Sequence, residues 1–444
     1  MGVKAVARDR AQSVLDTRHV FSINEYDMKR NYADSPKIPK YRALRGRLPE
    51  GQFGCRITSG TLRYAAVFVI GIALLAALPL ASAGTTKTES AQTSGRLFVC
   101  NTLSDTVSVI DDASGQVIAT IPVGHRPIRI VASKDRQKVF TSNWLGASIS
   151  VIDTVNLVVS ATIPVTVKPQ ETEVTPDGTR LFVVHHPEQV VSVIDIATNT
   201  VIQVVPIGVP PAGGKTATDI AFTPNGRYAL VPNYAKNVLD CIDTRTYAVT
   251  DIPTGLQPRR VAVMPMGTGH RAFVANFVSD SVTAVDTRSL AVVGTVPAGD
   301  EARGIAVNPQ GNQVGVTNVF GGTITFFDPN TLTEQSTVQV GHKPWNLIYN
   351  RDGSKVIVSN SGNDTITVID TATRKVIKTV DCHNGPFFSV FNDDETKLYV
   401  SCAGQLNPPF NPGFVDIVDT ATYNVIGSTE IQLQPFDETF VNPF

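Results

Sequence analysis

Eight aspartates recur along the chain at nearly equal intervals, each closing a segment of the V-x-V-I-D type. They are Asp111, Asp153, Asp195, Asp243, Asp286, Asp328, Asp370 and Asp419. The intervals between them are 42, 42, 48, 43, 42, 42 and 49 residues. A period of this length in a pattern of short apolar strands indicates a β-propeller or a β-solenoid, in which each repeat packs on its neighbours.

The most regular copy, residues 356–386, shows what one repeat contains. Four strands can be distinguished, which we name A to D. Strand A follows a G-x-x-P segment and ends at a turn such as 176–178 (Pro-Asp-Gly), which supplies the preset φ of proline and the positive φ of glycine. Strand B is of the type found at 96–101 (RLFVCN), strand C carries V-x-V-I-D, and strand D is of the xVIxTIPVG type.

The end of strand B carries the clearest recurring motif. It occurs as FVCN at 98–101, FTSN at 140–143, FVAN at 273–276, GVTN at 315–318 and IVSN at 357–360. In these copies, and from residue 96 to the C-terminus, the chain resembles the YVTN-type β-propeller repeat family. The resemblance implies an all-β fold of four-stranded blades, most often seven of them.

The repeat count nevertheless predicts eight blades. The first repeat begins at strand B, and the tail at 434–442 repeats the strand A pattern. We therefore expect the C-terminal strand to complete the first blade and close the ring, which leaves no long free sheet edge. The alternative is a seven-bladed ring with one terminal repeat outside it.

The chain preceding the repeats divides into three segments. Residues 1–63 form a basic extension without a hydrophobic pattern, which could reflect a misassigned start. Residues 64–83 are apolar and end in Ala-Ser-Ala, which is typical of a signal peptide, although an uncleaved inner-membrane anchor is the alternative. Residues 84–95 form a Ser/Thr-rich linker, and 96–444 form the propeller. We therefore expect an exported protein, periplasmic or extracellular.

Composition narrows the function classes. The net charge is −1, so no global field favours nucleic acid, and a membrane role depends on residues 64–83 remaining as an anchor. The five cysteines form neither C-x-x-C nor C-x-x-C-H, which argues against covalent haem attachment and a thioredoxin-like site. Cys55 precedes the export segment, and the disulfide state of Cys100, Cys241, Cys382 and Cys402 stays open.

Two long intervals indicate which face of the ring carries loops. The 48-residue interval reflects an insertion at 209–217 between strands D and A, and the 49-residue interval reflects an insertion at 403–414 between strands B and C. Because strands alternate in direction, D–A and B–C connections share one face of the ring. Insertions on one face of a repeat fold commonly mark its binding face.

One position of strand A varies from blade to blade where a structural repeat would be expected to keep it constant. It is the second residue after the repeat proline, occupied in turn by Arg129, Glu171, Asp219, Arg260, Gly304, Asn346, Phe388 and Asp437. Strand A lines the central channel, so these side chains are expected at its mouth. They could hold a small polar ligand or form a self-neutralising ring of ion pairs.

Other candidates lie just after strand B and in the long D–A loop. They are Trp144, His186, Tyr234, Phe277 and Lys215, which could rim a binding surface, while the aromatic ones could instead pack between blades. Adjacent residues of a strand point to opposite faces, so His185 and His186 cannot easily share a metal ion. No spacing of histidines or cysteines predicts a metal site.

Two functions remain. The first is an exported, non-enzymatic binding or scaffold propeller for a protein, glycan or small ligand, with no catalytic residue and no cofactor predicted. The second is a propeller enzyme or enzyme subunit, either lactonase-like or working with haem or a quinone, which the resemblance alone implies. A lactonase-like site would need metal ligands at the channel, where Glu171, Asp219, Asn346 and Asp437 are the candidates.

Overall fold

The chain folds entirely into β-strands over the residues that the structure describes. This computed structural model describes residues 95–208, 217–265, 267, 269–404 and 410–442. These ranges contain 32 strands, arranged as eight four-stranded antiparallel sheets. None of the described residues belongs to a helix of the length and apolarity needed to cross a bilayer. The expected N-terminal extension, signal segment and nearly all of the linker lie outside the described residues.

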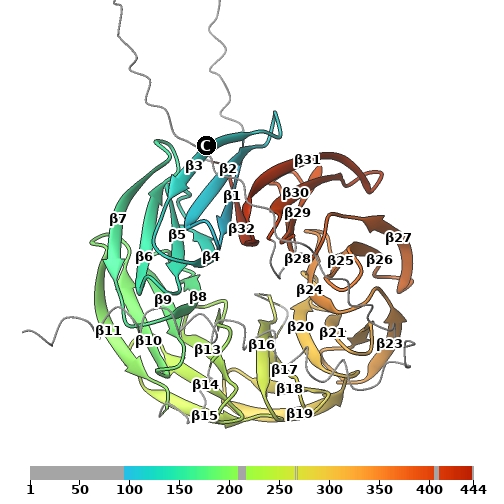
Figure 1. Cartoon of the computed structure of the whole chain (residues 1–444). Helices are drawn as coiled ribbons and strands as arrows, with labels where there is room; N and C mark the ends of the chain where they lie inside the picture. Colours follow the sequence, from blue (N-terminus) through green and yellow to red (C-terminus); the bar gives the residue numbers. More distant parts are fainter. Residues whose placement is uncertain (1–94, 209–216, 266, 268, 405–409, 443–444) are drawn as a thin grey trace, which may run out of the picture. The chain divides into compact units, whose positions relative to one another are not determined.

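Each sheet is one blade, and its four strands correspond to the expected strands A to D (Figure 1). Strands A, nearest the channel, are β32 (Pro435–Val441), β4 (Pro127–Ala132), β8 (Pro169–Val174), β12 (Ala221–Phe222), β16 (Pro258–Val263), β20 (Ala302–Val307), β24 (Pro344–Tyr349) and β28 (Pro386–Phe391). Strands B are β1 (Arg96–Asn101), β5 (Lys138–Asn143), β9 (Arg180–His185), β13 (Tyr228–Asn233), β17 (Arg271–Asn276), β21 (Val314–Asn318), β25 (Lys355–Asn360) and β29 (Lys397–Cys402).

The two remaining strands of each blade lie further out. Strands C are β2 (Thr106–Asp111), β6 (Ser148–Asp153), β10 (Val190–Asp195), β14 (Val238–Asp243), β18 (Ser281–Asp286), β22 (Thr323–Phe327), β26 (Thr365–Asp370) and β30 (Pro412–Asp419). Strands D are β3 (Val117–Pro122), β7 (Val158–Pro164), β11 (Thr200–Pro206), β15 (Val249–Pro253), β19 (Ala291–Pro297), β23 (Glu334–Gln339), β27 (Lys375–Asp381) and β31 (Asn424–Leu433).

The C-terminal strand closes the ring as expected. The first blade has the strand order β3-β2-β1-β32, so its innermost strand comes from the end of the chain. Leu97 of β1 pairs with Phe440 of β32, and Arg96 pairs with Val441. The prediction of eight blades is confirmed, and the seven-bladed alternative is wrong because all eight repeats form sheets within the ring.

The hydrophobic core lies between neighbouring blades. Strands B and C are buried on both faces, whereas strands D are mostly exposed and most have one buried residue near their end. One cluster joins Phe98 and Val109 of the first blade to Val139 and Ile152 of the second. Each blade therefore depends on its neighbours for burial of its apolar residues, which is why the repeats form one body.

Two recurring polar residues hold the turns of each blade. Asn143, at the end of β5, donates from Nδ2 to Ser148 and Ser150 and so fastens the hairpin between strands B and C. Asp153 accepts hydrogen bonds from the backbone N of Val155 and Asn156, as expected of an aspartate that starts the C–D turn. These residues are architectural.

His185 takes the place of this asparagine in the third blade. It is fully buried, and its Nε2 lies 2.8 Å from Ser192 Oγ, seven residues further on, as in the other blades. Its Nδ1 lies 3.2 Å from the backbone oxygen of Val167. Burial lowers the pKa of His185 to about 4, so the ring is neutral and fastens the hairpin.

Candidate functional site

The variable position of strand A faces the channel because the strand is irregular at that point. In seven blades the pairing with strand B shifts between the first residue of strand A and the following residues, for example between Pro127 and Arg129. Such β-bulges re-aim a side chain and are common beside functional sites. At these residues the β-bulge therefore interrupts the regular alternation of side chains between the two faces of the strand.

Two ion pairs connect neighbouring blades at this level. Arg129 Nε lies 2.6 Å from Glu171 Oε2, and both side chains are almost fully buried. Arg260 lies 3.2 Å from Asp219 Oδ1, and Asp219 Oδ2 also accepts the backbone N of Val261 at 2.9 Å. In each case the carboxylate and the arginine come from adjacent innermost strands. Four of the eight variable positions thus form two ion pairs between neighbouring blades.

Aromatic rings complete the arrangement across the channel. Phe388 of the eighth blade lies with its ring centre 5.1 Å from the Arg129 guanidinium and 5.8 Å from that of Arg260. Phe436 contacts Arg129 at the same 5.1 Å, and Asp437 Oδ2 accepts the backbone N of Ile130 at 3.1 Å. Arginines of the second and fifth blades thus meet one aromatic side chain from the eighth. We call this set the channel cluster: Arg129, Glu171, Asp219, Arg260, Phe388, Phe436 and Asp437.

The remaining two predicted positions are accommodated differently. Gly304 is the member of the variable set that has no side chain, and a Cβ there would lie 2.9 Å from Thr317 Oγ1 and 3.0 Å from the Trp345 carbonyl oxygen. The blade is packed too closely at this point for a larger residue. Asn346, half-buried on β24, lies next to Gly304.

Two further buried acidic side chains lie on the inner strands near the channel cluster and were not predicted. Glu173 lies two residues after Glu171 on β8, and Glu438 follows Asp437 on β32. Ser401 Oγ donates a hydrogen bond to Glu438. The i, i+2 spacing of Glu171 and Glu173 on β8 is the sequence signal that could have identified Glu173, because residues two apart on a strand point to the same face.

The channel holds more carboxyl groups than arginines, and their titration reflects this. Burial raises the pKa of Asp219 to about 6, against the opposing effect of Arg260. Burial likewise raises the pKa of Asp437 to about 6 and that of Glu173 to about 7. Burial also opposes the charge of Arg129, but Glu171 and Asp437 outweigh it and raise the arginine pKa. Arg129 therefore stays charged, while Asp219 and Asp437 take up protons at about pH 6 and Glu173 at about pH 7.

The first testable prediction concerns stability against pH. In the unfolded chain these carboxyl groups lose their protons near pH 4, whereas the folded chain holds them to about pH 6 for Asp219 and Asp437 and about pH 7 for Glu173. The folded state binds more protons in this window, so the free energy of unfolding should fall as the pH rises from about 4.5 to about 7.5. Thermal unfolding at these pH values measures the effect.

A matched pair of substitutions assigns the pH dependence to the channel. Asp437→Asn keeps an acceptor for the Ile130 amide and removes the titration, so it should flatten the slope, whereas the exposed Asp300→Asn should leave it unchanged. Measurements stay above pH 4.5, because the aspartates of the C–D turns have lowered pKa values, as at Asp370, where turn hydrogen bonds lower it to about 2. An unaltered slope in Asp437→Asn would contradict the assignment.

A second group of side chains lies one residue earlier on the inner strands, toward the face of the D–A and B–C loops. Arg259 stacks between two predicted residues, with its guanidinium 4.3 Å from the ring centre of Phe277 and 5.0 Å from that of Tyr234. Arg303 stacks on Trp345 at 3.3 Å. Both arginines thus lie against aromatic faces at the mouth of the channel.

An aromatic row continues around the mouth from Trp345. Its ring meets Phe387 edge-on at 5.1 Å between centres, and Phe387 lies 6.0 Å from Phe436. The indole Nε1 of Trp345 is buried and has no hydrogen-bond partner. We call the set Tyr234, Arg259, Phe277, Arg303, Trp345 and Phe387 the mouth cluster. The sequence argument identified Tyr234 and Phe277 and missed the other four, because it followed the neighbouring position of strand A.

The other predicted face residues lie apart from this cluster. Trp144 is buried and stacks with Lys168, whose Nζ lies 5.2 Å from the ring centre. His186 is half-buried, and its backbone N donates to the Lys168 carbonyl oxygen. Lys215 lies outside the described residues, as does most of the insertion at 209–217. In the described ranges, no group of three or more His, Cys, Asp or Glu side chains is placed to hold a metal ion.

The four cysteines of the propeller are free thiols. Cys402 takes the place of the hairpin asparagine in the eighth blade, with its sulfur 3.5 Å from Asp416 Oδ2. Asp416 also pairs with His383, whose Nδ1 lies 2.7 Å from Oδ1 and whose ring stacks on Phe414. These contacts fasten the D–A loop of this blade to its B–C hairpin.

A comparison with models of protein families found a match. A model of YNCE-like β-propellers matches residues 120–223 and 313–418. The chain is a β-propeller that is similar to this family, and its repeats resemble the YVTN type. The match spans blades on both sides of the ring and agrees with the degenerate YVTN strands. A comparison with curated protein sequences gave no significant match.

Solved structures share the fold at low sequence identity. A hydrazine synthase structure from Kuenenia stuttgartiensis has a TM-score of 0.53 at 21% identity, covering 66% of this chain and 96% of that one. The structure of the dihydro-heme d1 dehydrogenase NirN in complex with DHE has a TM-score of 0.66 at 13% identity. The match covers 81% of this chain and 77% of that one. The structure of a functionally unknown protein from Desulfotomaculum acetoxidans DSM 771 has a TM-score of 0.54 at 17% identity. The match covers 79% of this chain and 100% of that one. These likenesses concern the propeller fold.

Proposed function

We propose that this β-propeller is an exported, non-enzymatic binding protein whose ligand contacts the mouth cluster. The observation that carries the proposal is the pair of arginines, Arg259 and Arg303, stacked on aromatic rings above the channel cluster. Elsewhere the blades repeat one another closely. At the mouth they differ, and the differences are in charged and aromatic side chains.

The chemistry of the mouth favours an anionic ligand with a planar or apolar part. Guanidinium groups recognise planar carboxylate and phosphate groups and stack on aromatic rings. The row of Trp345, Phe387 and Phe436 supplies apolar contact area beside it. An acidic peptide segment of a partner protein, an acidic glycan or a small organic anion would meet both requirements.

The acidic groups beneath the mouth are engaged in structural pairs. Glu171 and Asp219 pair with arginines, and Asp437 accepts a backbone amide. A lactonase-like metal site would need these carboxylates to converge on an ion, so their present pairing favours binding over hydrolysis. Export rests on the apolar segment 64–83 and its Ala-Ser-Ala end, with delivery to the periplasm or the extracellular space.

A second testable prediction follows for the mouth arginine. Protein purified from its native host should carry a compound or partner that mass spectrometry identifies after denaturation. Arg303→Met should weaken binding of that compound by about ten- to a hundredfold, which corresponds to about 1.5 to 3 kcal/mol for a hydrogen bond to a charged group. Arg288→Gln, an exposed arginine of a C–D turn on the opposite face, is the control. Equal binding by wild type and Arg303→Met would contradict the proposal.

The alternative function is an exported redox enzyme or enzyme subunit with a haem or quinone cofactor. It rests on the fold shared with a hydrazine synthase and with a dehydrogenase bound to DHE. The absorbance spectrum of the protein from its native host separates the two functions. A cofactor chromophore that remains through purification would favour the enzyme, and its loss in Arg303→Met would place that cofactor at the mouth.

A further inference from the structure

The opposite face of the ring, where the A–B and C–D turns lie, carries a repeated contact between blades. The first residue of strand B reaches across to the C–D turn of the next blade and donates to a backbone carbonyl there. Lys138 Nζ lies 2.9 Å from the Ile196 oxygen, and Arg180 lies 2.5 Å from the Thr244 oxygen. The same contact is made by Arg96 to Thr154, by Arg271 to Asn330 and by Lys397 to Asp112.

The sixth blade departs from this pattern. Gln313 stands where five other blades have a lysine or arginine that makes the contact, and its Nε2 lies 3.4 Å from the Thr371 oxygen of the seventh blade. The side chain is shorter and neutral, and it is held back by Gln335 Oε1 at 3.1 Å. Tyr228 fills this position with a ring in the fourth blade, and Lys355 remains basic but pairs with Asp370 of its own blade.

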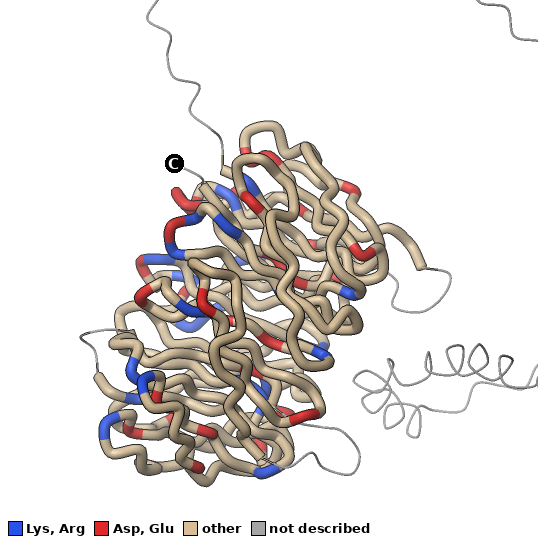
Figure 2. The backbone as a smooth tube through the Cα atoms, turned by 90° about the vertical axis from the view of Figure 1, so that its left-hand side faces the viewer, with Lys and Arg blue, Asp and Glu red and all other residues tan. Residues whose placement is uncertain are grey.

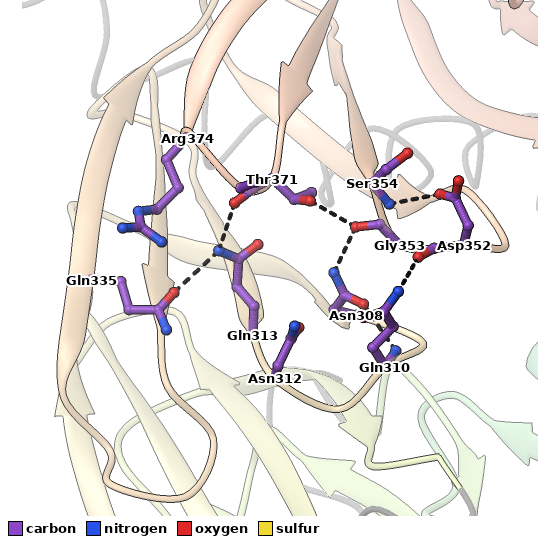
Figure 3. A pocket seen from close by; sticks show the side chains of 11 residues that line it. Asn308, Gln310, Asn312, Gln313, Gln335, Asp352, Gly353, Ser354, Thr371 and Arg374 are labelled. Atoms are coloured by element: carbon purple, nitrogen blue, oxygen red, sulfur yellow. Dashed lines mark hydrogen bonds between the residues drawn. The ribbon is translucent and has the colours of Figure 1, made fainter.

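A polar cavity lies where the long basic side chain is missing. Its volume is about 390 Å³, within the range of small-molecule sites. Figure 3 shows Gln313 at its centre, with Gln335 and Arg374 to one side and Asp352 to the other. Both blades contribute to the wall, which makes the cavity an inter-blade site on the face opposite the mouth cluster.

The wall is fixed by hydrogen bonds between the two blades. Asn308 Nδ2 donates to the Gly353 oxygen at 2.7 Å, and Gln310 Nε2 donates to the Asp352 oxygen at 2.7 Å. Thr371 Oγ1 also donates to the Gly353 oxygen at 2.7 Å. The cavity is therefore preformed, so little free energy of binding would be lost in ordering the residues around a ligand.

The functional groups of the wall select the class of ligand. The lining combines amides with one guanidinium, from Arg374, and one carboxylate, from Asp352, and it contains no aromatic ring. Ser354 hydrogen bonds lower the pKa of Asp352, which keeps it ionised as an acceptor. Amides, carboxylate and guanidinium together offer donors and acceptors in several directions, as a ligand with many hydroxyl groups requires. A base or an apolar ligand would find no stacking surface here.

We propose that this inter-blade cavity is a carbohydrate site that takes one or two sugar units, with Arg374 facing an acidic group where the sugar carries one. Gln313 creates the site by replacing the basic contact residue, and Gln335, Asp352 and Arg374 supply the hydroxyl and carboxylate contacts. The site is independent of the mouth cluster and goes beyond the function proposed for it.

The repeat itself provides the decisive variant. Gln313→Arg installs the residue that Arg96, Arg180 and Arg271 represent in other blades, so it should fold, contact the C–D turn of the seventh blade and fill the cavity. Galacturonate and galactose, which differ in one carboxylate, are the probes, and isothermal titration or saturation-transfer NMR measures their binding. Wild type should bind galacturonate with a dissociation constant on the order of millimolar or below, and galactose more weakly.

Three outcomes are expected together. Gln313→Arg should lose at least about tenfold in affinity for galacturonate while its melting temperature is unchanged or raised. Arg374→Gln should remove the preference for galacturonate over galactose, and Arg288→Gln, outside the cavity on the same face, should bind as wild type. Binding of neither sugar by wild type, or equal binding by wild type and Gln313→Arg, would overturn the proposal. Arg303→Met, at the mouth, should leave sugar binding intact, which separates this test from that of the proposed function.

Discussion

A chain that ends at Leu433 is expected to lose the closed ring and with it the cooperative unfolding of the propeller. The truncation removes β32, the strand that completes the first blade by pairing with β1. It exposes β1 as a free edge and removes Phe440 and Val441 from contact with the first blade. Full burial of one such side chain contributes about 1.5 to 3 kcal/mol, so the loss of these two should cost about 3 to 6 kcal/mol.

The truncated chain also loses part of the channel. Phe436 and Asp437 leave the channel cluster, so Arg129 loses an aromatic neighbour and a carboxylate that supports its charge. The exposed edge of β1 offers unpaired backbone groups to other molecules, and we expect dimers or aggregates as a result. Calorimetry and size-exclusion chromatography of the truncated chain measure both effects.

Two comparisons test the closure directly. Removal of residues 443–444 alone, which lie outside the described part of the chain, should leave the melting temperature unchanged. A synthetic peptide of residues 434–442 added to the truncated chain should pair with β1 and raise its melting temperature, as strand addition does at other free sheet edges. A truncated chain that melts as cooperatively as wild type would show that the ring does not need β32.

The architecture was predictable because the sequence contains eight copies of the same repeat. The spacing of residues such as Asp153 and Asp195 gave the blade length, and the strand A pattern in the tail gave the closing strand. For a single departure from the repeat, such as His185 in place of asparagine, the sequence predicts only that the residue lies at the end of strand B. Its hydrogen bond to Ser192 required the hairpin geometry.

The site was predictable to the extent that the repeat fixes its register. The sequence argument compared one position of strand A, and in seven blades a β-bulge lies at that position. Glu173 and Phe436 were missed, since each occupies a different register from the position that was compared. Contacts across the ring, such as Phe388 with Arg260, join blades that the sequence gives no means of pairing.

The two faces of the ring differ in how their features arise. The mouth cluster results from added charged and aromatic groups such as Arg303 and Trp345, whereas the cavity at Gln313 results from a missing basic side chain. Figure 2 shows Lys and Arg interspersed with Asp and Glu, so charges of both signs lie side by side. Departures from the repeat, read together with the contacts that each one changes, identify both sites.

Replacement of Arg129 by methionine is expected to destabilise the propeller by about 3 to 5 kcal/mol at pH 7.5, because it leaves Glu171 buried without its partner. Methionine keeps much of the packing against Phe388 and Phe436, so the loss reflects mainly the charge. At pH 5 the loss should be smaller, because Asp219 and Asp437, with pKa values raised by burial to about 6, carry protons and no longer repel the unpaired Glu171. Urea unfolding at the two pH values gives the difference.

Two further variants decide whether the ion pair or the general loss of a side chain is responsible. Arg129→Met combined with Glu171→Gln removes both charges and should recover at least half of the lost stability at pH 7.5, since no buried charge remains unpaired. Arg136→Met breaks an exposed pair with Asp393 and should cost less than about 1 kcal/mol. If the double variant were as unstable as Arg129→Met alone, the arginine would act through packing, and the channel cluster would owe its stability to its aromatic rings.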